Sequence, residues 1–372
     1  MKIAIFHSFL KVKGGAEVVM TKIKEKYNAD FWTGSVLISE FNVTKTDFIN
    51  SSLFDNKTKF VALTTEKNDL LYFPNRLWNL AFNQKIKELL EYDVVIFTGN
   101  LWFVQTRLRK LIQKNNSKTK LINYCNTPPR FLCDQREEKL AKFPAPIKFV
   151  ANKICDIALD LYKKDISSCD IIIGNSQNIQ KRIKKYLNLD VPYIFPPCKT
   201  CQYVGEGEYF LSHSRLEDMK RIGLIVEAFA KMPDKKIIFC STGPLKNWLV
   251  DQCKIYPNIT YQGIVSEERL VELIGSCKAG IVIPVDEDAG MVQVELMSAG
   301  KPVLAVSEGG MLETVIEGET GYFVPANPTV QDIISAVQKF ETLKDWKPKC
   351  IAQAKLFSET AFFEQLDKYI KL

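Results

Sequence analysis

The sequence predicts an α/β fold with two parallel β-sheets, each covered by helices on both faces. Apolar runs of strand length alternate with segments of helical periodicity, and this alternation is typical of parallel sheets. The alternation runs through the chain twice, and a short polar stretch with glycines at 198–208 separates the two parts as a linker would. At 372 residues the chain also exceeds the length at which one hydrophobic core stops growing, so two domains are expected.

The first part opens with a strand at Lys2–Phe6, a polar loop containing Gly14-Gly15 and a helix at Ala16–Lys26. A further helix is expected at Gln177–Leu187, where Asn175 or Ser176 can cap its start. Other buried strands are expected at Phe31–Thr33, Val94–Phe97, Lys120–Tyr124 and Asp170–Ile173.

The second part opens with a strand at Tyr209–Ser212 and a helix at Arg221–Lys231. Further strands are expected at Lys236–Cys240, Ile259–Tyr261, Ala279–Pro284 and Pro302–Ala305, with helices at Leu245–Cys253 and Glu267–Cys277. We assign 1–197 to the first domain and 205–351 to the second. The tail at 352–372 has apolar residues at helical spacing, and we expect this helix to pack back on the first domain.

The composition is typical of a globular cytoplasmic protein. No apolar run approaches the roughly 20 residues that a membrane span needs, and the run Ile3–Phe6 is too short for a signal peptide. The ten cysteines are scattered through mostly apolar contexts, which favours buried, reduced thiols over a disulfide framework. Cys198 and Cys201 form a lone C-x-x-C, and with only two histidines in the chain a zinc site is not expected.

Positive charge is concentrated in the first domain. Residues 1–197 hold 31 Lys and Arg against 19 Asp and Glu, a net of +12, whereas the remainder has a net of −5. A basic half favours an anionic partner such as nucleic acid, an anionic membrane or a phosphorylated substrate, with plain solubility as the alternative. The stretch Tyr72–Trp78 mixes aromatic and basic residues as a membrane-proximal surface does, although an ordinary packed helix has the same pattern.

Two carboxylates, Glu287 and Glu295, follow the strand expected at Ala279–Pro284. Gly290 frees the backbone at the turn between them, and a helix is expected from Met291 to Ala299. The unpaired N–H groups of a helix start can hold a diphosphate without a metal. Because carboxylates only accept hydrogen bonds, the pair suits the hydroxyls of a sugar and a ribose, and the segment predicts a nucleotide-sugar site.

Cations and glycines follow other expected strands. Arg215 and Lys220 lie in a loop before a helix, where they could neutralise a diphosphate and stabilise it as it departs. With these cations present, Asp286-Glu287-Asp288 is not expected to bind a metal as a D-x-D motif. Gly14 and Gly15 let the backbone approach a bound group, in a loop that lacks the dinucleotide and P-loop patterns.

Asn126 and Gly243 also come directly after expected strands. Adjacent prolines stiffen the loop that carries Asn126 and Arg130, which could present either residue to a ligand. Since ligands bind at the carboxyl ends of parallel strands, all of these loops are expected at one edge of each domain, lining a cleft.

Several motifs share their order and spacing with one known family. They are the Gly-Gly loop followed by Ala16-Glu17, the Tyr124–Arg130 loop, Asn175–Gln177 with Pro196-Pro197, Ser214–Arg221, Glu287–Glu295 and Ala299–Ala305. Together they resemble the glycosyltransferase family 4 enzymes of the GT-B fold, in which two Rossmann-like domains face a central cleft. The similarity covers nearly the whole chain and is strongest to the branch that handles mannose, rhamnose and related sugars.

The resemblance implies a retaining, metal-independent hexosyltransferase without a cofactor. It would move a mannose-like sugar from a nucleotide-diphosphate donor, GDP-mannose first among them, to a glycan or lipid-linked acceptor in polysaccharide or glycoconjugate synthesis. The first domain would hold the acceptor and the second the donor. By the resemblance, Arg215 and Lys220 bind the donor diphosphate, Glu287 the transferred sugar and Glu295 the ribose. Backbone amides of Gly15, Gly290, Met291 and Val292 would contact the phosphates or the sugar.

One departure from the family concerns Asn126, where family members usually have a histidine thought to touch the donor sugar. Asparagine can donate and accept hydrogen bonds but cannot carry a proton charge. A non-catalytic sugar-nucleotide-binding or scaffold protein is therefore the alternative, beside a transferase that uses a UDP-sugar. An epimerase fits the cations and carboxylates less well, and no lysine is placed for the pyridoxal cofactor of a phosphorylase. We expect a cytoplasmic protein that is peripheral at an anionic membrane through its basic first domain, with no nucleic-acid partner.

Overall fold

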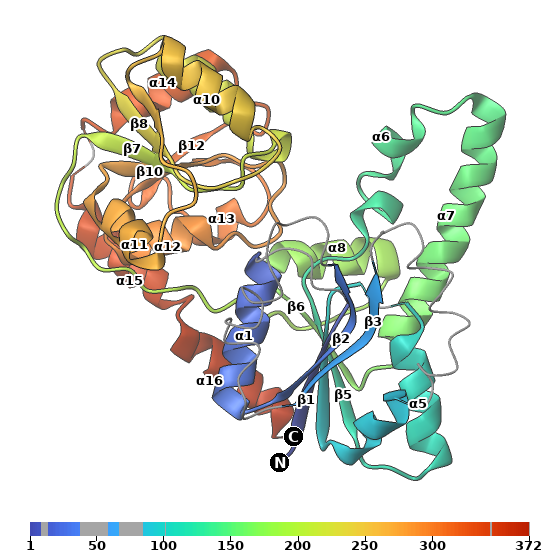
Figure 1. Cartoon of the computed structure of the whole chain (residues 1–372). Coiled ribbons are helices and arrows are strands. Elements are labelled where there is room, and N and C mark those ends of the chain that lie inside the picture. Colours follow the sequence, from blue (N-terminus) through green and yellow to red (C-terminus); the bar gives the residue numbers. More distant parts are fainter. Residues whose placement is uncertain (9–13, 38–58, 67–84, 101, 343, 372) are drawn as a thin grey trace. The chain divides into compact units, whose positions relative to one another are not determined.

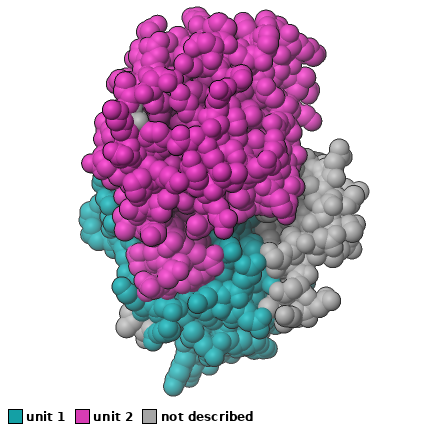
Figure 2. Space-filling view, turned by 90° about the vertical axis from the view of Figure 1, so that its left-hand side faces the viewer, with its two compact units in different colours: residues 1–194, 367–372 teal, residues 195–366 magenta. Residues whose placement is uncertain are grey.

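The structure is a computed structural model that describes residues 1–8, 14–37, 59–66, 85–100, 102–342 and 344–371 (Figure 1). The chain forms two compact units, coloured separately in Figure 2. The first comprises Met1–Ile194 with Asp367–Leu372, and the second comprises Phe195–Leu366. Each unit contains one six-stranded sheet whose neighbouring strands are parallel, so the predicted fold class of two parallel-sheet α/β domains is confirmed.

The sheet of the first unit has the strand order β3-β2-β1-β4-β5-β6. Its strands are β1 (Ile3–His7), β2 (Asp30–Leu37), β3 (Phe60–Glu66), β4 (Val94–Thr98), β5 (Lys120–Cys125) and β6 (Ile171–Gly174). Every residue of β1 and β4 is buried, as expected for central parallel strands that helices cover on both faces. The chain extends the sheet in one direction from β1 to β3 and in the other from β4 to β6, so the order reverses between β1 and β4.

Helices of the first unit follow the strands. They are α1 (Gly15–Tyr27), η3 (Glu88–Glu91), α5 (Val104–Lys114), η4 (Arg130–Leu132), α6 (Arg136–Leu140), α7 (Ala145–Ile166) and α8 (Gln177–Leu187). Ser176 caps α8 as expected, because its hydroxyl accepts a hydrogen bond from the Ile179 N–H. Helix α1 ends at Asn28 in the left-handed conformation. No helix in the described part of the chain is long and apolar enough to cross a bilayer.

The sheet of the second unit repeats this topology with the order β12-β11-β10-β7-β8-β9. Its strands are β7 (Tyr209–Ser212), β8 (Lys236–Phe239), β9 (Ile259–Tyr261), β10 (Ala279–Val282), β11 (Val303–Val306) and β12 (Gly321–Val324). Its helices are η5 (Asp218–Lys220), α9 (Ile222–Ala230), α10 (Lys246–Ile255), α11 (Glu267–Ser276), α12 (Val292–Ser298), α13 (Met311–Thr314), α14 (Val330–Lys339), α15 (Trp346–Lys355) and most of α16 (Glu359–Ile370).

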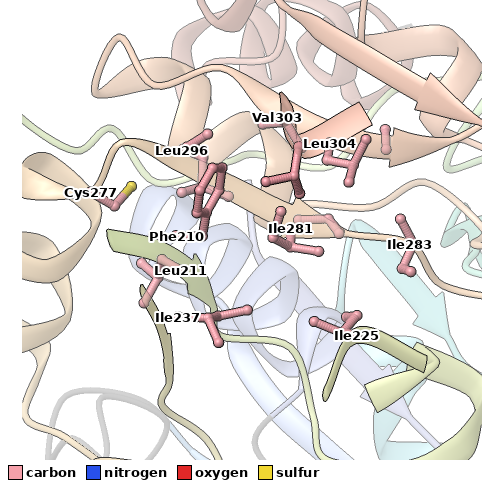
Figure 3. Packing of buried hydrophobic residues seen from close by; sticks show 14 of the residues in the cluster. Phe210, Leu211, Ile225, Ile237, Cys277, Ile281, Ile283, Leu296, Val303 and Leu304 are labelled. Carbon is pink, nitrogen blue, oxygen red and sulfur yellow. The ribbon is translucent and has the colours of Figure 1, made fainter. Parts of the chain in front are cut away.

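The core of the second unit fixes helix α12 on the sheet (Figure 3). Leu296 of α12 is fully buried beside Phe210 of β7 and Val303 of β11. Gly280 in β10 leaves room for the Leu296 side chain, since a Cβ atom at Gly280 would overlap it. Because Leu296 is closely packed, the core also fixes the position of Glu295, the residue before it in α12.

The stretch expected as a linker, 198–208, lies within the second unit. Cys198 and Cys201 are buried in its core, and the Val204 N–H donates to the Gly275 carbonyl oxygen (2.9 Å). All ten cysteines are free thiols and seven of them are buried, as the sequence predicts for reduced cysteines in apolar contexts. Burial raises the pKa of the Cys201 thiol to about 11.

The tail expected as one helix at 352–372 forms the end of α15 and then α16. Residues up to Leu366 belong to the second unit, and Asp367–Leu372 belong to the first. Within the first unit the Tyr27 hydroxyl donates to the Asp367 carboxylate, and the Lys120 ammonium donates to the Tyr369 carbonyl oxygen, both at 2.7 Å.

We predict that Asp165 makes the stability of the first unit depend on pH. This fully buried carboxylate of α7 accepts hydrogen bonds from the Thr106 N–H (2.8 Å) and the Gln105 amide (3.1 Å) of α5, and burial raises its pKa to about 6. Because the folded protein holds the proton more tightly than the unfolded chain, this stabilisation is complete below about pH 4 and is lost as the pH rises through 6. Asp165→Asn should remove this dependence. Between pH 4 and 7 the melting temperature of the wild type should therefore fall relative to that of the variant. The expected change in relative stability is on the order of 2–3 kcal/mol, and a constant difference across this range would contradict it.

Candidate functional site

The candidate site of the second unit lies where the strand order reverses. Strands β7 and β10 are neighbours in the sheet, and the chain continues from them to opposite edges. Loops that leave the carboxyl ends of such a strand pair separate and open a crevice, which is where parallel α/β sheets bind ligands. The loop after β7 carries Arg215 and Lys220, and the loop after β10 carries Glu287. The sheet therefore brings together residues that are about 70 positions apart in the chain.

Lys220 and Glu287 form an ion pair across this crevice. Lys220 ends the short helix η5, and both side chains are about one quarter exposed. The two loops are also joined through their backbones, because the Val285 N–H donates to the Met219 carbonyl oxygen (2.7 Å). The Glu287 carbonyl oxygen accepts a hydrogen bond from the Gly310 N–H (2.8 Å), which fixes this loop from the other side.

Arg221 holds the loop after β10 in place from the start of α9. Its guanidinium donates to the carbonyl oxygens of Ile283 and Pro284 at 2.9 and 2.8 Å, and to the Glu308 carboxylate at 2.8 Å. The backbone of Arg221 has a φ of +51°, which is uncommon for a residue with a long side chain. These hydrogen bonds offset the strain of that conformation.

Glu295 faces His213 on the same side of the sheet. The Glu295 Oε2 lies 3.2 Å from Nε2 of His213, the first residue after β7. The His213 side chain is 5% exposed, and its Nδ1 has no hydrogen-bond partner among the described residues. His213 therefore restricts the orientation of the Glu295 carboxylate.

The turn before α12 depends on Gly290. Its φ of +74° is in the left-handed region that favours glycine, and a Cβ atom there would overlap the side chains of Gln293 and Met311. Met291 is the N-cap residue and Val292 the first residue of α12, close to the helix start expected from the sequence. The amide of Gln293 donates to the Gly290 carbonyl oxygen (2.9 Å), so the turn is held from within the helix.

Gly243 supports the loop that carries Arg215. The Leu216 N–H donates to the Thr242 carbonyl oxygen (3.0 Å), and the Leu245 N–H donates back to the Leu216 carbonyl oxygen (3.0 Å). A Cβ atom on Gly243 would overlap that carbonyl oxygen. The Arg215 side chain is half exposed and lies 3.7 Å from the Glu217 carboxylate. This surface pairing leaves its guanidinium accessible to a ligand.

In the first unit, Gly14 and Gly15 lie at the strand reversal between β1 and β4. Gly14 caps α1, but its N–H donates to the Glu17 carboxylate (2.9 Å). Glu17 also lies 3.7 Å from Nε2 of the buried His7, and burial raises the Glu17 pKa. Of the two glycines, Gly14 therefore has its amide already engaged within the protein.

Asn126 follows β5, and its side-chain amide makes no hydrogen bond to any part of the chain that the structure describes. The residues after it are anchored. The buried Arg182 of α8 donates to the Thr127 hydroxyl (2.8 Å), and Arg130 donates to the Asp134 carboxylate at 2.6 and 2.9 Å. The loop is thus rigid behind Asn126, while Arg130 is committed to a local ion pair.

Three residues that fix loops at the strand reversals were not assigned roles from the sequence, namely His213 and Arg221 in the second unit and Glu17 in the first. His213 comes directly after β7 and Arg221 directly after Lys220, so both flank the Arg215–Lys220 segment, and this position is a signal that the sequence contains. Glu17 lies three residues after Gly14, the spacing of a capping box. Within the described ranges no group of three or more His, Cys, Asp or Glu side chains could hold a metal ion.

Comparison with known proteins gives consistent matches. The sequence profile of the family described as glycosyl transferases group 1 matches residues 203–357. The chain is 24% identical over 401 residues to the alpha-1,3/1,6-mannosyltransferase ALG2 of Dictyostelium discoideum, a match covering 91% of this chain and 89% of that protein. It is 23% identical over 295 residues to human ALG2, with 68% of each chain covered.

Solved structures match over the whole of both chains. HepE of Anabaena in complex with UDP-glucose has a TM-score of 0.72 at 15% identity. The lipopolysaccharide outer core galactosyltransferase WaaB has a TM-score of 0.71, also at 15% identity. At these identities the structures establish the fold, and they confirm the two-domain architecture expected from the sequence.

We predict that Gly243→Ala displaces the loop that carries Arg215. The new methyl group would overlap the Leu216 backbone, so the free energy of unfolding should fall by about 2–4 kcal/mol. Gly263→Ala is the matched control, because Gly263 has a φ of +74° but open space around its Cβ position. It should cost about 1 kcal/mol, the cost of the backbone conformation alone. Equal losses in denaturant titrations of the two variants would contradict a steric role for Gly243.

Proposed function

Because this chain is a glycosyltransferase of the GT-B fold with a group 1 domain over residues 203–357, we propose that it transfers mannose from a nucleotide-diphosphate sugar. GDP-mannose is the proposed donor, and a glycan or lipid-linked molecule in glycoconjugate synthesis is the proposed acceptor. We propose mannose as the transferred sugar because the similar ALG2 proteins of Dictyostelium discoideum and human are named alpha-1,3/1,6-mannosyltransferases.

One observation carries the proposal. Two carboxylates lie at the crevice between β7 and β10, and each has its own partner, Lys220 for Glu287 and His213 for Glu295. Arg215 lies on the loop after β7 with its side chain half exposed. Separate partners orient the two carboxylates independently, as recognition of two different parts of a donor requires. Glu287 would accept hydrogen bonds from the transferred sugar and Glu295 from the ribose.

The chemistry that we propose breaks the bond between the anomeric carbon and the diphosphate oxygen. A bond to the acceptor oxygen forms on the same face, with retention, and the acceptor proton passes to the departing phosphate. Arg215 and Lys220 would stabilise the negative charge that develops on the diphosphate, in place of a metal ion. Amides at the start of α12, around Gly290, Met291 and Val292, would add to that stabilisation.

The first unit would receive the acceptor. Gly15 and Asn126 lie at the carboxyl edge of its sheet, where a substrate of a parallel α/β domain binds. The net charge of +12 over residues 1–197 supports peripheral association of a cytoplasmic enzyme with an anionic membrane. The stretch Tyr72–Trp78, whose sequence suggests a membrane-proximal surface, lies outside the described residues.

We predict different kinetic defects for Glu295→Ala and Arg215→Ala. Loss of the ribose contact should raise the dissociation constant for the donor by roughly 10- to 100-fold. Loss of Arg215 should mainly lower kcat, by about 100-fold, because its charge acts on the departing diphosphate. Thermal-shift screening against GDP-, UDP- and dTDP-sugars selects the donor, and transfer or hydrolysis of that donor gives the rates.

Arg269→Ala and Glu272→Ala are matched controls, since these residues form an exposed ion pair on α11 of the same unit (2.7 Å). Both controls should retain wild-type binding and rates. Full activity of both site variants would contradict the assignment. Tight binding of a sugar nucleotide without turnover of any donor would favour the non-catalytic alternative that Asn126 raises.

A further inference from the structure

The helical hairpin between β5 and β6 has an exposed end that the proposed reaction does not use. It consists of α6, a short connection and α7, and α7 extends well beyond the sheet of the first unit (Figure 1). We call residues 139–153, which span the end of α6, the connection and the first two turns of α7, the hairpin tip. Ala141–Ile147 is exposed at every position, so this part of the tip does not pack on the unit that carries it.

Large apolar side chains cover the hairpin tip. The exposed fractions are 48% for Phe143, 53% for Ile147, 66% for Phe149 and 56% for Val150. The exposed apolar face continues along α7 through Ile154, Ile157 and Leu161, at the spacing of three and four residues that places side chains on one side of a helix. Contiguous apolar exposure of this kind marks an interaction surface rather than an ordinary solvated helix.

The charge of the hairpin tip is uniformly positive. Residues 139–153 contain four lysines, Lys139, Lys142, Lys148 and Lys153, and no Asp or Glu. Lys148 lies 3.6 Å from the exposed Glu137, just outside the tip. Aromatic and aliphatic side chains among lysines complement an anionic lipid surface, where rings enter the headgroup region and ammonium groups meet phosphates. A second copy of the chain would instead present a like-charged tip.

The base of the hairpin is fixed, so the tip is presented rigidly. Tyr162, Asp165 and Ile166 at the end of α7 are buried, and Asp165 accepts the hydrogen bond from the Thr106 N–H of α5. Nearer the tip, Arg136 of α6 donates to Asp156 of α7 (2.7 Å) and links the two helices. The prolines Pro144 and Pro146 suit the start of α7, because their fixed φ favours a first helical turn. A preformed surface loses little conformational entropy when it binds.

We propose that the hairpin tip docks this protein on an anionic phospholipid bilayer. Phe143, Ile147, Phe149 and Val150 enter the interface, and the four lysines bind lipid phosphates. The chain enters the hairpin from the carboxyl end of β5, where Asn126 lies, so docking holds the acceptor-side edge of the first unit near the membrane surface. This last point rests on the proposed function, because it makes a lipid-linked acceptor the favoured class.

The test is partition of the full-length protein onto vesicles, measured by co-sedimentation without any sugar donor. Vesicles of phosphatidylcholine with 30% phosphatidylglycerol should bind the wild type, and pure phosphatidylcholine vesicles should bind it much less. The double variant K142Q/K153Q should lower partition by roughly 25-fold, about fivefold for each lysine. F143S/F149S should lower it at least about tenfold, because binding scales with the apolar area that enters the interface. Higher salt should weaken binding of the wild type.

Control variants at exposed apolar and lysine side chains come from the second unit. I255S/I264S removes two aliphatic side chains that are 62% and 79% exposed, and K231Q/K254Q removes two exposed lysines. Both should bind vesicles as the wild type does. All four variants change exposed side chains, so their melting temperatures should match, which separates lost docking from lost folding.

Several outcomes would overturn the inference. They are absence of binding to the anionic vesicles, equal losses in the hairpin and control variants, or a vesicle-free dimer in sedimentation velocity that the hairpin variants dissociate. The last result would identify a second copy as the occupant. Protein that binds vesicles but transfers no sugar would overturn the proposed function alone, and protein that transfers sugar without binding vesicles would overturn the docking alone.

Discussion

The guanidinium of Arg221 joins the two loops on which the candidate site depends. It reaches from the start of α9 to the carbonyl oxygens after β10 and to Glu308 after β11. Carbonyl oxygens at the ends of central strands would otherwise be left without partners in a poorly solvated place, which is costly. One planar group with several donors satisfies them together and sets the spacing of the loops. Together with the backbone hydrogen bond between Val285 and Met219, this spacing lets Lys220 and Glu287 face each other.

The order of the strands explains why the two units share an architecture but differ at their sites. In both sheets the chain returns to the centre and then extends the opposite edge, so a crevice opens at the same topological position. In the second unit, opposite charges line that position. In the first unit, the Glu17 carboxylate accepts the hydrogen bond of the Gly14 N–H at the start of α1. This N–H is therefore already paired within the protein and does not need an external anion. The second unit thus presents charged side chains at this position, which suit the diphosphate of the proposed donor, and the first presents the Asn126 amide.

The strands and the loops that carry the site could be predicted because both are local properties of the chain. Buried parallel strands appear as unbroken apolar runs, as at Ile3–Phe6, and polar loop residues directly after them lie at the carboxyl edge. The pairing of Glu295 with His213 could not be predicted, because it depends on β7 being the neighbour of β10 and not on chain order. The exposure of the apolar stripe on α7 could not be predicted, because periodicity alone assigns such a stripe to the core. The stretch at 198–208 lies within the second unit, because the side chains of Cys198 and Cys201 enter its core.

The chain leaves the first unit after Ile194 and re-enters it at Asp367, so the second unit is an insertion within the first. This connectivity has a consequence for the order of synthesis. The six strands of the first sheet have all been made before Phe195 emerges, yet the segment that pairs with Tyr27 and Lys120 is made only after the whole second unit. During translation the first unit therefore lacks its C-terminal segment, which leaves one side of α1 and the start of β5 uncovered until the second unit has been synthesised. Chaperones that act on nascent chains would therefore encounter the first unit without its C-terminal segment throughout the synthesis of the second unit.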